Sequence, residues 1–322
     1  MSTNPALAAI LSAVWLAGAT TGLEPGLLFH ASFDGTVAAE SLSGRGTPVT
    51  AAEAAPPAFA PGRFGQALVC GPGLALPHYP TEGNVLPESG TISLWVCPQN
   101  WDGADGNFHS FFESGSEAEG TGWLVLYKYY QNGWLLWRYA QGKTNVGMAT
   151  ASATAWQPGA WHHVVGTWSR EALRLYVDGE PAGDAPRPFV APTLGATFHL
   201  GDDGWHLPHA GARTLIDEVR IYAYPLSPER IRQLAMKSRL TVSRAAAGRE
   251  WRVSVELPPT PVARVQLAVL QPGTPAPLRT AEAEPRQGVA AGTLDVADLA
   301  AGDYVVTATL LDAAGQPVGA AR

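Results

Sequence analysis

Several features that mark common protein classes are scarce or absent in this sequence. Only two of the 322 residues are cysteines, and neither has a second cysteine or a histidine at the spacing of zinc ligands. Lys and Arg number 21 against 28 Asp and Glu, and the net charge of −7 is unlike the basic surface that binds nucleic acid. Motifs for a serine nucleophile (G-x-S-x-G) and a phosphate-binding loop are also missing. A zinc protein and a nucleic-acid-binding protein are therefore not expected.

The one long apolar segment lies at the N-terminus. Residues 6–19, ALAAILSAVWLAGA, are too few to span a bilayer, and they end in the small-residue pattern of a signal-peptidase site. The segment predicts a signal peptide over residues 1–19 and a secreted, periplasmic or cell-surface protein with no membrane span in the mature chain. No lysine or arginine precedes it, so an ordinary buried helix is the alternative.

Glycine, proline and tryptophan are abundant, with 35, 27 and 11 residues. This composition is typical of many short strands joined by tight turns. Apolar and polar residues alternate in short segments from Leu27 to Leu226, and Asn132-Gly133 between two such segments is a strong hairpin signal. One helix is expected after Ser227, which can cap it. The pattern predicts an all-β fold, with a two-sheet sandwich over residues 24–236.

The last part of the chain, residues 239–322, has the same alternation with proline-rich connections. It predicts a second, smaller β-sandwich of immunoglobulin-like type. The final expected strand is cut short at Arg322, which suggests that the chain is part of a longer surface or secreted protein.

Six segments of the first domain form a recognisable series. They are LLFHASFDG (27–35), GRFGQAL (62–68), TISLWVCP (91–98), WHHVVGTW (161–168), LRLYVDG (173–179) and IDEVRIYAYPLSPERI (216–231). Each alone is weak, but in this order they resemble the laminin G-like branch of the concanavalin A-like lectin/glucanase superfamily. The resemblance implies a two-sheet jelly roll whose first and last strands lie close together.

Asp217 is an unusual residue for the strand in which it is expected. In a regular strand it would share a face with the apolar Val219 and Ile221, and a buried carboxylate needs a partner. The resemblance implies a structural Ca²⁺ where the first and last strands meet, held by Asp34, Asp217 and the carbonyl of Gly65. The alternative is that Asp34 forms a turn and Asp217 accepts backbone hydrogen bonds.

Aromatic residues are concentrated between positions 101 and 139. Alternation places Trp123, Tyr127 and Tyr129 on one face of a strand, and Trp137 on the following strand of the same hairpin. Rings of this kind can stack on sugars, so we expect these four to include ligand contacts, together with Asp203 and Trp205 in a nearby loop. The alternative is that the rings form the sandwich core.

The cysteines, Cys70 and Cys97, lie in separate predicted strands. In an exported protein they are either joined as a disulfide or remain two buried thiols.

The functional expectation follows from what the acidic residues lack. The E-x-D-x-x-E signature of the superfamily's glucanases is absent, and no catalytic residues are expected. The sequence therefore predicts an exported, non-catalytic carbohydrate-binding module with a polysaccharide or glycan as its partner. The alternative is a structural or adhesive module that binds other surface proteins, and a glycoside hydrolase is the least favoured interpretation.

Overall fold

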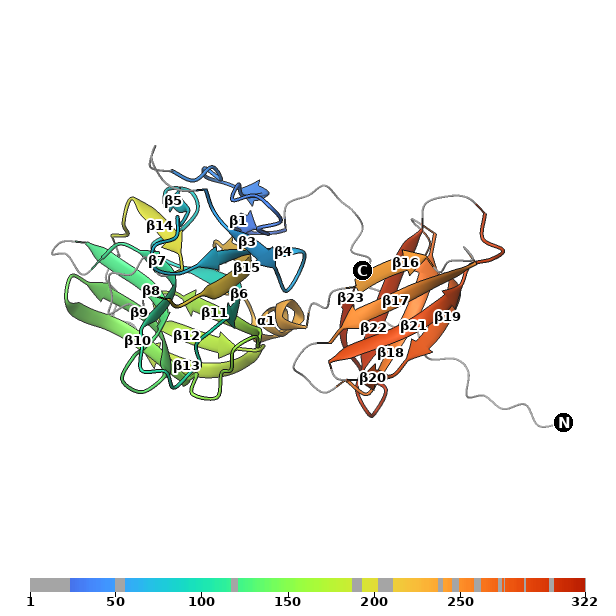
Figure 1. The fold of residues 1–322 in the computed structure, drawn as a ribbon. Coiled ribbons are helices and arrows are strands. Elements are labelled where there is room, and N and C mark those ends of the chain that lie inside the picture. Colours follow the sequence, from blue (N-terminus) through green and yellow to red (C-terminus); the bar gives the residue numbers. More distant parts are fainter. Residues whose placement is uncertain are drawn as a thin grey trace. The chain divides into compact units, whose positions relative to one another are not determined.

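The protein is described here by a computed structural model. It describes residues 24–49, 56–116, 121–186, 193–201, 211–236, 240–244, 249–257, 262–271, 274, 276–286, 288–300 and 304–321. The chain divides into two compact units, one spanning Leu23–Ala235 and one containing Met236–Arg322. Both are built from antiparallel strands (Figure 1), and the prediction of an all-β fold is confirmed.

The first unit contains a nine-stranded sheet. Its main order is β13-β12-β11-β6-β15-β1-β2, and β4 also pairs with β15 and with β3. The strand bounds are β1 (Leu27–Ala31), β2 (Ser41–Leu42), β3 (Phe59–Pro61), β4 (Gln66–Cys70), β6 (Gly90–Pro98), β11 (His162–Trp168), β12 (Ala172–Val177), β13 (Glu180–Pro186) and β15 (Thr214–Tyr222). Strands β1 and β15 pair directly, as the family resemblance implies.

A six-stranded sheet packs against it, in the order β10-β9-β8-β7-β14-β5. Its strands are β5 (His78–Pro80), β7 (His109–Ser114), β8 (Gly122–Lys128), β9 (Trp134–Gln141), β10 (Thr144–Ser152) and β14 (Thr197–Leu200). Side chains from both sheets form one buried cluster, for example Leu94 and Ile216 from the larger sheet with Trp137 and Phe198 from the smaller. The alternation read from the sequence thus builds a two-layer sandwich.

Strand β15 departs from regular alternation at its centre. Ile216, Val219 and Ile221 all belong to the cluster between the sheets, and the pairing with β6 shifts between Asp217 and Arg220. Glu218 has a φ of 52°, which marks a β-bulge. The expectation that Asp217 shares a face with Val219 and Ile221 is therefore wrong, because the extra residue turns Asp217 away from the interior.

Helix α1 (Pro228–Ala235) follows β15 and covers part of the outer face of the larger sheet. The Ser227 hydroxyl accepts a hydrogen bond from the Arg230 backbone N–H at 3.2 Å, which is the cap that the sequence predicts. Ile231 and Leu234 are buried against Tyr222 of β15 and other residues of the same cluster. Within the part of the chain that the structure describes, no helix has the length and apolar character required to cross a bilayer.

The second unit consists of two four-stranded antiparallel sheets, in the orders β16-β17-β21-β20 and β19-β18-β22-β23. The strands are β16 (Leu240–Arg244), β17 (Glu250–Glu256), β18 (Arg264–Leu270), β19 (Pro277–Ala283), β20 (Pro285–Arg286), β21 (Val289–Asp295), β22 (Val305–Leu311) and β23 (Pro317–Ala321). Val255, Leu267 and Leu310 contribute to a core that is separate from that of the first unit. The immunoglobulin-like character of this unit stays a prediction.

Candidate functional site

A row of aromatic rings lies on the outer face of the six-stranded sheet. Trp123 and Tyr127 of β8 belong to a cluster distinct from the sandwich interior, to which their neighbours Leu124 and Leu126 point. The rings of Trp123 and Tyr127 are stacked with centroids 6.4 Å apart. Beyond Tyr127 the row continues to Tyr129 at 6.3 Å. Alternation along β8 thus carries the aromatic side chains toward the β8–β9 turn.

Three of the four rings expected to contact a ligand are buried. Trp137 is fully buried between the sheets, and its indole N–H donates to the carbonyl of Thr167 at 2.9 Å. Trp123 and Tyr127 are 1% and 4% exposed, although they lie on the outer face. The expectation is corrected for these three, because their rings are packed away from solvent, and Tyr129, which is half-buried, remains a candidate.

The exposed end of the aromatic row is at the β8–β9 turn. Trp134 at the start of β9 is 45% exposed, and Tyr129 and Tyr130 beside it have ring centroids 4.6 Å apart at an angle of 51°. The neighbouring residues of the turn and of the end of β10 are polar and uncharged, and Arg138 lies farther along the row, over the ring of Trp123. We call this surface the rim patch, and it comprises Tyr129, Tyr130, Gln131, Asn132, Trp134, Ser152 and Thr154.

Hydrogen bonds order the rim patch. The Gln131 side-chain amide donates to the Tyr130 hydroxyl at 3.1 Å, and the Asn132 side-chain oxygen accepts from the Trp134 backbone N–H at 3.1 Å. The Ser152 and Thr154 hydroxyls lie 2.9 Å apart. The patch therefore presents aromatic faces next to amide and hydroxyl groups, and none of its side chains carries a charge.

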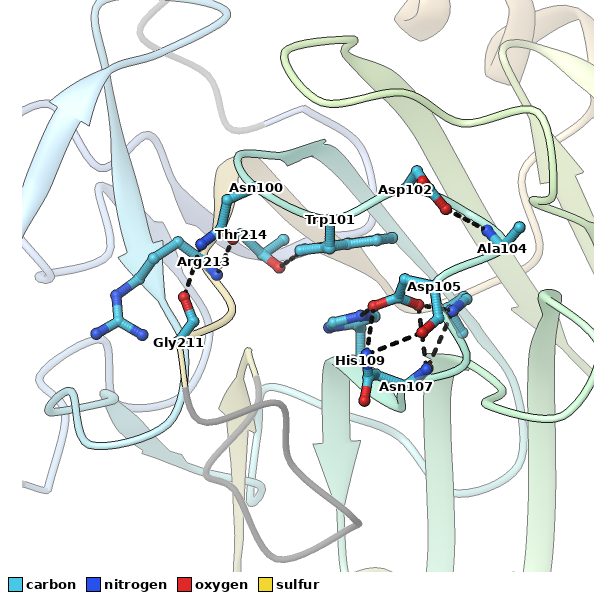
Figure 2. A network of polar contacts seen from close by, with 11 residues as sticks. Asn100, Trp101, Asp102, Ala104, Asp105, Asn107, His109, Gly211, Arg213 and Thr214 are labelled. Atoms are coloured by element: carbon cyan, nitrogen blue, oxygen red, sulfur yellow. Dashed lines mark hydrogen bonds and ion pairs between the residues drawn. The ribbon is translucent and has the colours of Figure 1, made fainter.

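An ionic network around Asp105 (Figure 2) includes Lys128, the residue that precedes Tyr129 of the rim patch. The Asp105 carboxylate forms an ion pair with Lys128, the last residue of β8, and is 2.8 Å from the Nε2 atom of His109 at the start of β7. The Lys128 ammonium, fully buried, also donates to the carbonyl of Asn107 at 3.0 Å. Burial raises the pKa of Asp105, but hydrogen bonds from Lys128, His109 and Asn107 outweigh it and lower the pKa to about 2.

The loop that carries Asp105 is fixed at its other end as well. The Trp101 ring stacks on His109 at 3.9 Å, and its indole N–H donates to the Thr214 hydroxyl at 3.0 Å. Asn100 accepts from the Arg213 backbone N–H at 2.9 Å (Figure 2). No local sequence pattern predicts this network, because Lys128 in a tyrosine-rich strand gives no signal of its partner.

The residues expected to hold calcium do come together, around the β3–β4 turn. Asp217 accepts from the Phe64 backbone N–H at 2.8 Å, and Asp34 accepts from the Gln66 backbone N–H at 2.7 Å. The Gly65 carbonyl accepts from the Gly62 backbone N–H at 2.9 Å. Gly65 has a φ of 62°, and a Cβ there would collide with the Asp34 carboxylate, so glycine is required.

The second carboxylate oxygen of Asp217 provides a test of whether this place suits a cation. Its Oδ1 atom is buried and makes no hydrogen bond of normal geometry, and burial raises the pKa of Asp217 to about 8 although the backbone N–H groups of Phe64 and Glu218 both favour the carboxylate. Such an oxygen is satisfied by a cation or by a proton. Among the described residues no three His, Cys, Asp or Glu side chains gather as metal ligands. A calcium ion here would thus rely on two carboxylates, backbone carbonyls and water.

The cysteines are not joined. Both are free and buried, and they lie on strands that flank β15 on opposite sides, with Cys70 paired to Thr214 and Cys97 to Leu215. Their Cα atoms are therefore two strand spacings apart, about 9.6 Å at about 4.8 Å per spacing. This separation exceeds the roughly 7 Å that a disulfide can bridge between Cα atoms. The disulfide alternative is corrected to two separate thiols. The expected ligand residues Asp203 and Trp205 lie outside the described residues.

Part of the first unit is similar to a known superfamily. Residues 74–232 match a family model described as the Concanavalin A-like lectin/glucanases superfamily, which agrees with the resemblance read from the sequence. A comparison with curated proteins gave no match.

Solved structures share this fold. One is domain 4 of AbnA, a GH43 extracellular arabinanase from Geobacillus stearothermophilus, in complex with arabinotriose, with 23% identity, a TM-score of 0.50, and coverage of 64% of this chain and 96% of that one. Another is the binding domain of botulinum neurotoxin DC in complex with SialylT, with 9% identity, a TM-score of 0.52, and coverage of 89% and 86%. A third is the binding domain of Paraclostridial Mosquitocidal Protein 1, with 10% identity, a TM-score of 0.52, and coverage of 88% and 75%. These identities indicate a common fold, not a common ligand.

Proposed function

We propose that the chain is an exported, non-catalytic carbohydrate-binding module and that its ligand contacts the rim patch. The observation that carries the proposal is the exposed ring of Trp134, whose backbone carbonyl accepts from the Tyr129 N–H at 2.7 Å across the turn. Aromatic faces stack on the C–H faces of sugars, and the neighbouring amides and hydroxyls can exchange hydrogen bonds with sugar hydroxyls. A neighbour in the same fold was solved with arabinotriose, which supports a sugar as the ligand.

The chemistry of the rim patch favours a neutral polysaccharide. Its polar groups are the amides of Gln131 and Asn132 and the hydroxyls of Ser152 and Thr154, and none of them is a cation that would pair with an anionic sugar. The nearby Arg138 is engaged with the Trp123 ring and with the Asn145 side chain. The rings of Tyr129 and Tyr130 are tilted by 51°, so together they do not form a plane. A single soluble chain therefore fits this surface better than the flat face of a crystalline polymer.

A binding panel tests this proposal. Neutral pentose and hexose polysaccharides, sialylated glycans and crystalline cellulose are titrated against the wild type, Trp134→Ala and Tyr224→Ala. Tyr224 is a matched control, since it is a ring of similar exposure, 43%, that lies just after β15 and outside the rim patch. We expect Trp134→Ala to weaken binding of a neutral polysaccharide roughly tenfold, about 1.4 kcal/mol, and Tyr224→Ala to bind as the wild type does.

The alternative class of function is an outcome of the same panel. If the wild type binds no glycan, or if Trp134→Ala and Tyr224→Ala bind equally well, the rim patch is not a sugar site. A structural or adhesive module that binds protein would then be favoured.

We also propose that Asp34 and Asp217 hold a structural Ca²⁺ and that the second unit is a spacer. The buried Oδ1 atom of Asp217, which makes no hydrogen bond of normal geometry, supports the calcium proposal. When bound, calcium would neutralise the carboxylates and fasten the β3–β4 turn to β15, with no part in any reaction.

A further inference from the structure

We propose that Asp105 and Lys128 are positioning residues that hold the rim patch in its binding conformation. The proposal rests on the proposed function, and it concerns side chains that do not touch the ligand themselves. Asp105 is partly buried and Lys128 fully buried, so neither belongs to the rim patch.

The first link runs from the ion pair to the aromatic row. Lys128 and the side chain of Asn107, whose amide donates to Asp105 at 2.9 Å, fix the backbone on one side of Phe108, and His109 fixes it on the other. The Phe108 ring is thereby stacked on Tyr127 at 4.6 Å and 23°. Tyr127 in turn contacts Tyr129 edge-on, and Tyr129 is the first residue of the rim patch.

The second link runs from the same loop to the β8–β9 turn. Gly133, between Asn132 and Trp134, is buried, and a Cβ there would collide with the carbonyl oxygen of Gly103. Gly103 donates its backbone N–H to the Trp156 carbonyl at 3.0 Å. The loop over residues 99–108 therefore lies directly against the backbone that orients Asn132 and Trp134.

The energetics of a buried ion pair separate positioning from stability. Desolvation of the two charges offsets most of their attraction, so replacing both partners with uncharged groups of similar size is often neutral for stability. Removing one partner alone leaves an unpaired buried charge and destabilises the fold. Replacing both should thus keep the sandwich folded while releasing the loop from β8.

The test compares the wild type with the double variant Asp105→Asn/Lys128→Met. Hydrogen exchange of the amides of residues 99–108 and 129–134, measured without ligand, reports how well the loop is ordered. Affinity is measured for the neutral polysaccharide that binds the wild type best. Both measurements are made far below the melting temperature of every variant. We expect exchange in both segments to accelerate roughly tenfold. Affinity should fall roughly fivefold to tenfold, because the ligand must then order the loop when it binds. Exchange in β6 and β15 should not change.

The control replaces an ion pair elsewhere in the same unit. Arg174 and Asp184 form an exposed pair between β12 and β13 with a distance of 3.0 Å, and Arg174→Met/Asp184→Asn should leave both loop exchange and affinity unchanged. If the Asp105 double variant does not fold, Asn107→Ala removes the amide hydrogen bonds to Asp105 and keeps the ion pair. It should accelerate exchange in the same segments to a smaller extent.

The outcomes distinguish the two proposals. A folded double variant, or a folded Asn107→Ala variant in its place, with wild-type exchange in residues 99–108 and 129–134 would overturn the positioning proposal. Accelerated exchange with unchanged affinity would also overturn it, since the loop would then be ordered for stability alone. A wild type that binds no glycan refutes the proposed function, and the exchange data still decide whether the ion pair orders the loop.

Discussion

Asp217 makes the stability of the first unit depend on pH in a direction that is unusual for a carboxylate. Its pKa is raised to about 8 from 3.8 by burial, so the folded state holds a proton that the unfolded state has lost. The contribution of Asp217 to the free energy of unfolding therefore falls as pH rises from 4 to 8. Most paired carboxylates have lowered pKa values and act in the opposite direction.

The perturbation that isolates this effect is Asp217→Asn. The amide imitates the protonated acid, since its oxygen can accept the hydrogen bond from Phe64, but it has no proton to lose. Between pH 5 and pH 8 the wild type should lose about 4 kcal/mol relative to the variant, at 1.36 kcal/mol per pKa unit. This corresponds to roughly 8–16 °C in melting temperature for a unit of this size.

Thermal melts at pH 5 and pH 8, each with a chelator or with excess calcium, measure the effect. In chelator the variant should melt higher than the wild type at pH 8, by much more than at pH 5. Bound calcium would restore the wild type at pH 8 by about 2.7 kcal/mol at a hundredfold excess over its Kd, and it would not act on the variant. Asp184→Asn, an exposed acid, is the control.

Two results would refute this reasoning. Parallel pH profiles for the wild type and Asp217→Asn in chelator would mean that Asp217 is not a buried carboxyl group. If the wild type melts at the same temperature with chelator and with calcium at pH 8, the proposed metal site is excluded. The partner of the Asp217 carboxylate is then a proton.

Other changes test the core directly. Burial lowers the pKa of His163 to about 3, so the contribution of His163 to the free energy of unfolding should fall as pH drops from 6.5 toward 3. Urea titrations measure it as the difference between the wild type and His163→Gln, which should shift in favour of the variant over this range. Reductant should not change the melting temperature, and Cys70 and Cys97 should react with a thiol reagent only after unfolding, because both are buried. Trp137→Ala should lower the free energy of unfolding by about 3–5 kcal/mol in urea titrations, whereas a surface ring would matter far less.

Local sequence rules were sufficient to predict the strands and the hairpin that carries the rim patch. The Asn132-Gly133 pair predicts the turn between β8 and β9, and Gly133 has the positive φ of 63° that such a turn requires. Alternation also places Trp123 and Tyr127 on one face of β8, as observed, whereas the expectation that Trp137 joins them in one ligand site is wrong, because Trp137 lies on the opposite face of the sheet. These features depend only on neighbouring residues, which is why one sequence suffices.

The place of Asp217 could not be predicted in the same way. Its face depends on the bulge at Glu218, a residue with no intrinsic preference for positive φ. A contact from another strand supports that conformation, since Glu218 lies 3.6 Å from His30 of β1, and Glu218 also forms an ion pair with Arg220 of its own strand. A single extra residue reverses the alternation, so a correct strand prediction placed Asp217 on the wrong face.

The burial of the aromatic rings required information of a third kind. Alternation indicates which rings share a face, but not what covers that face. The burial of Lys128 could not be predicted either, because in a tyrosine-rich strand it resembles an ordinary surface lysine. Its partner Asp105 is separated from it in the sequence by a loop and another strand. Departures from local rules that persist in a fold often mark functional positions. Here a buried lysine beside the rim patch and a strained Glu218 beside Asp217 are such departures, and each adjoins one of the two proposed sites.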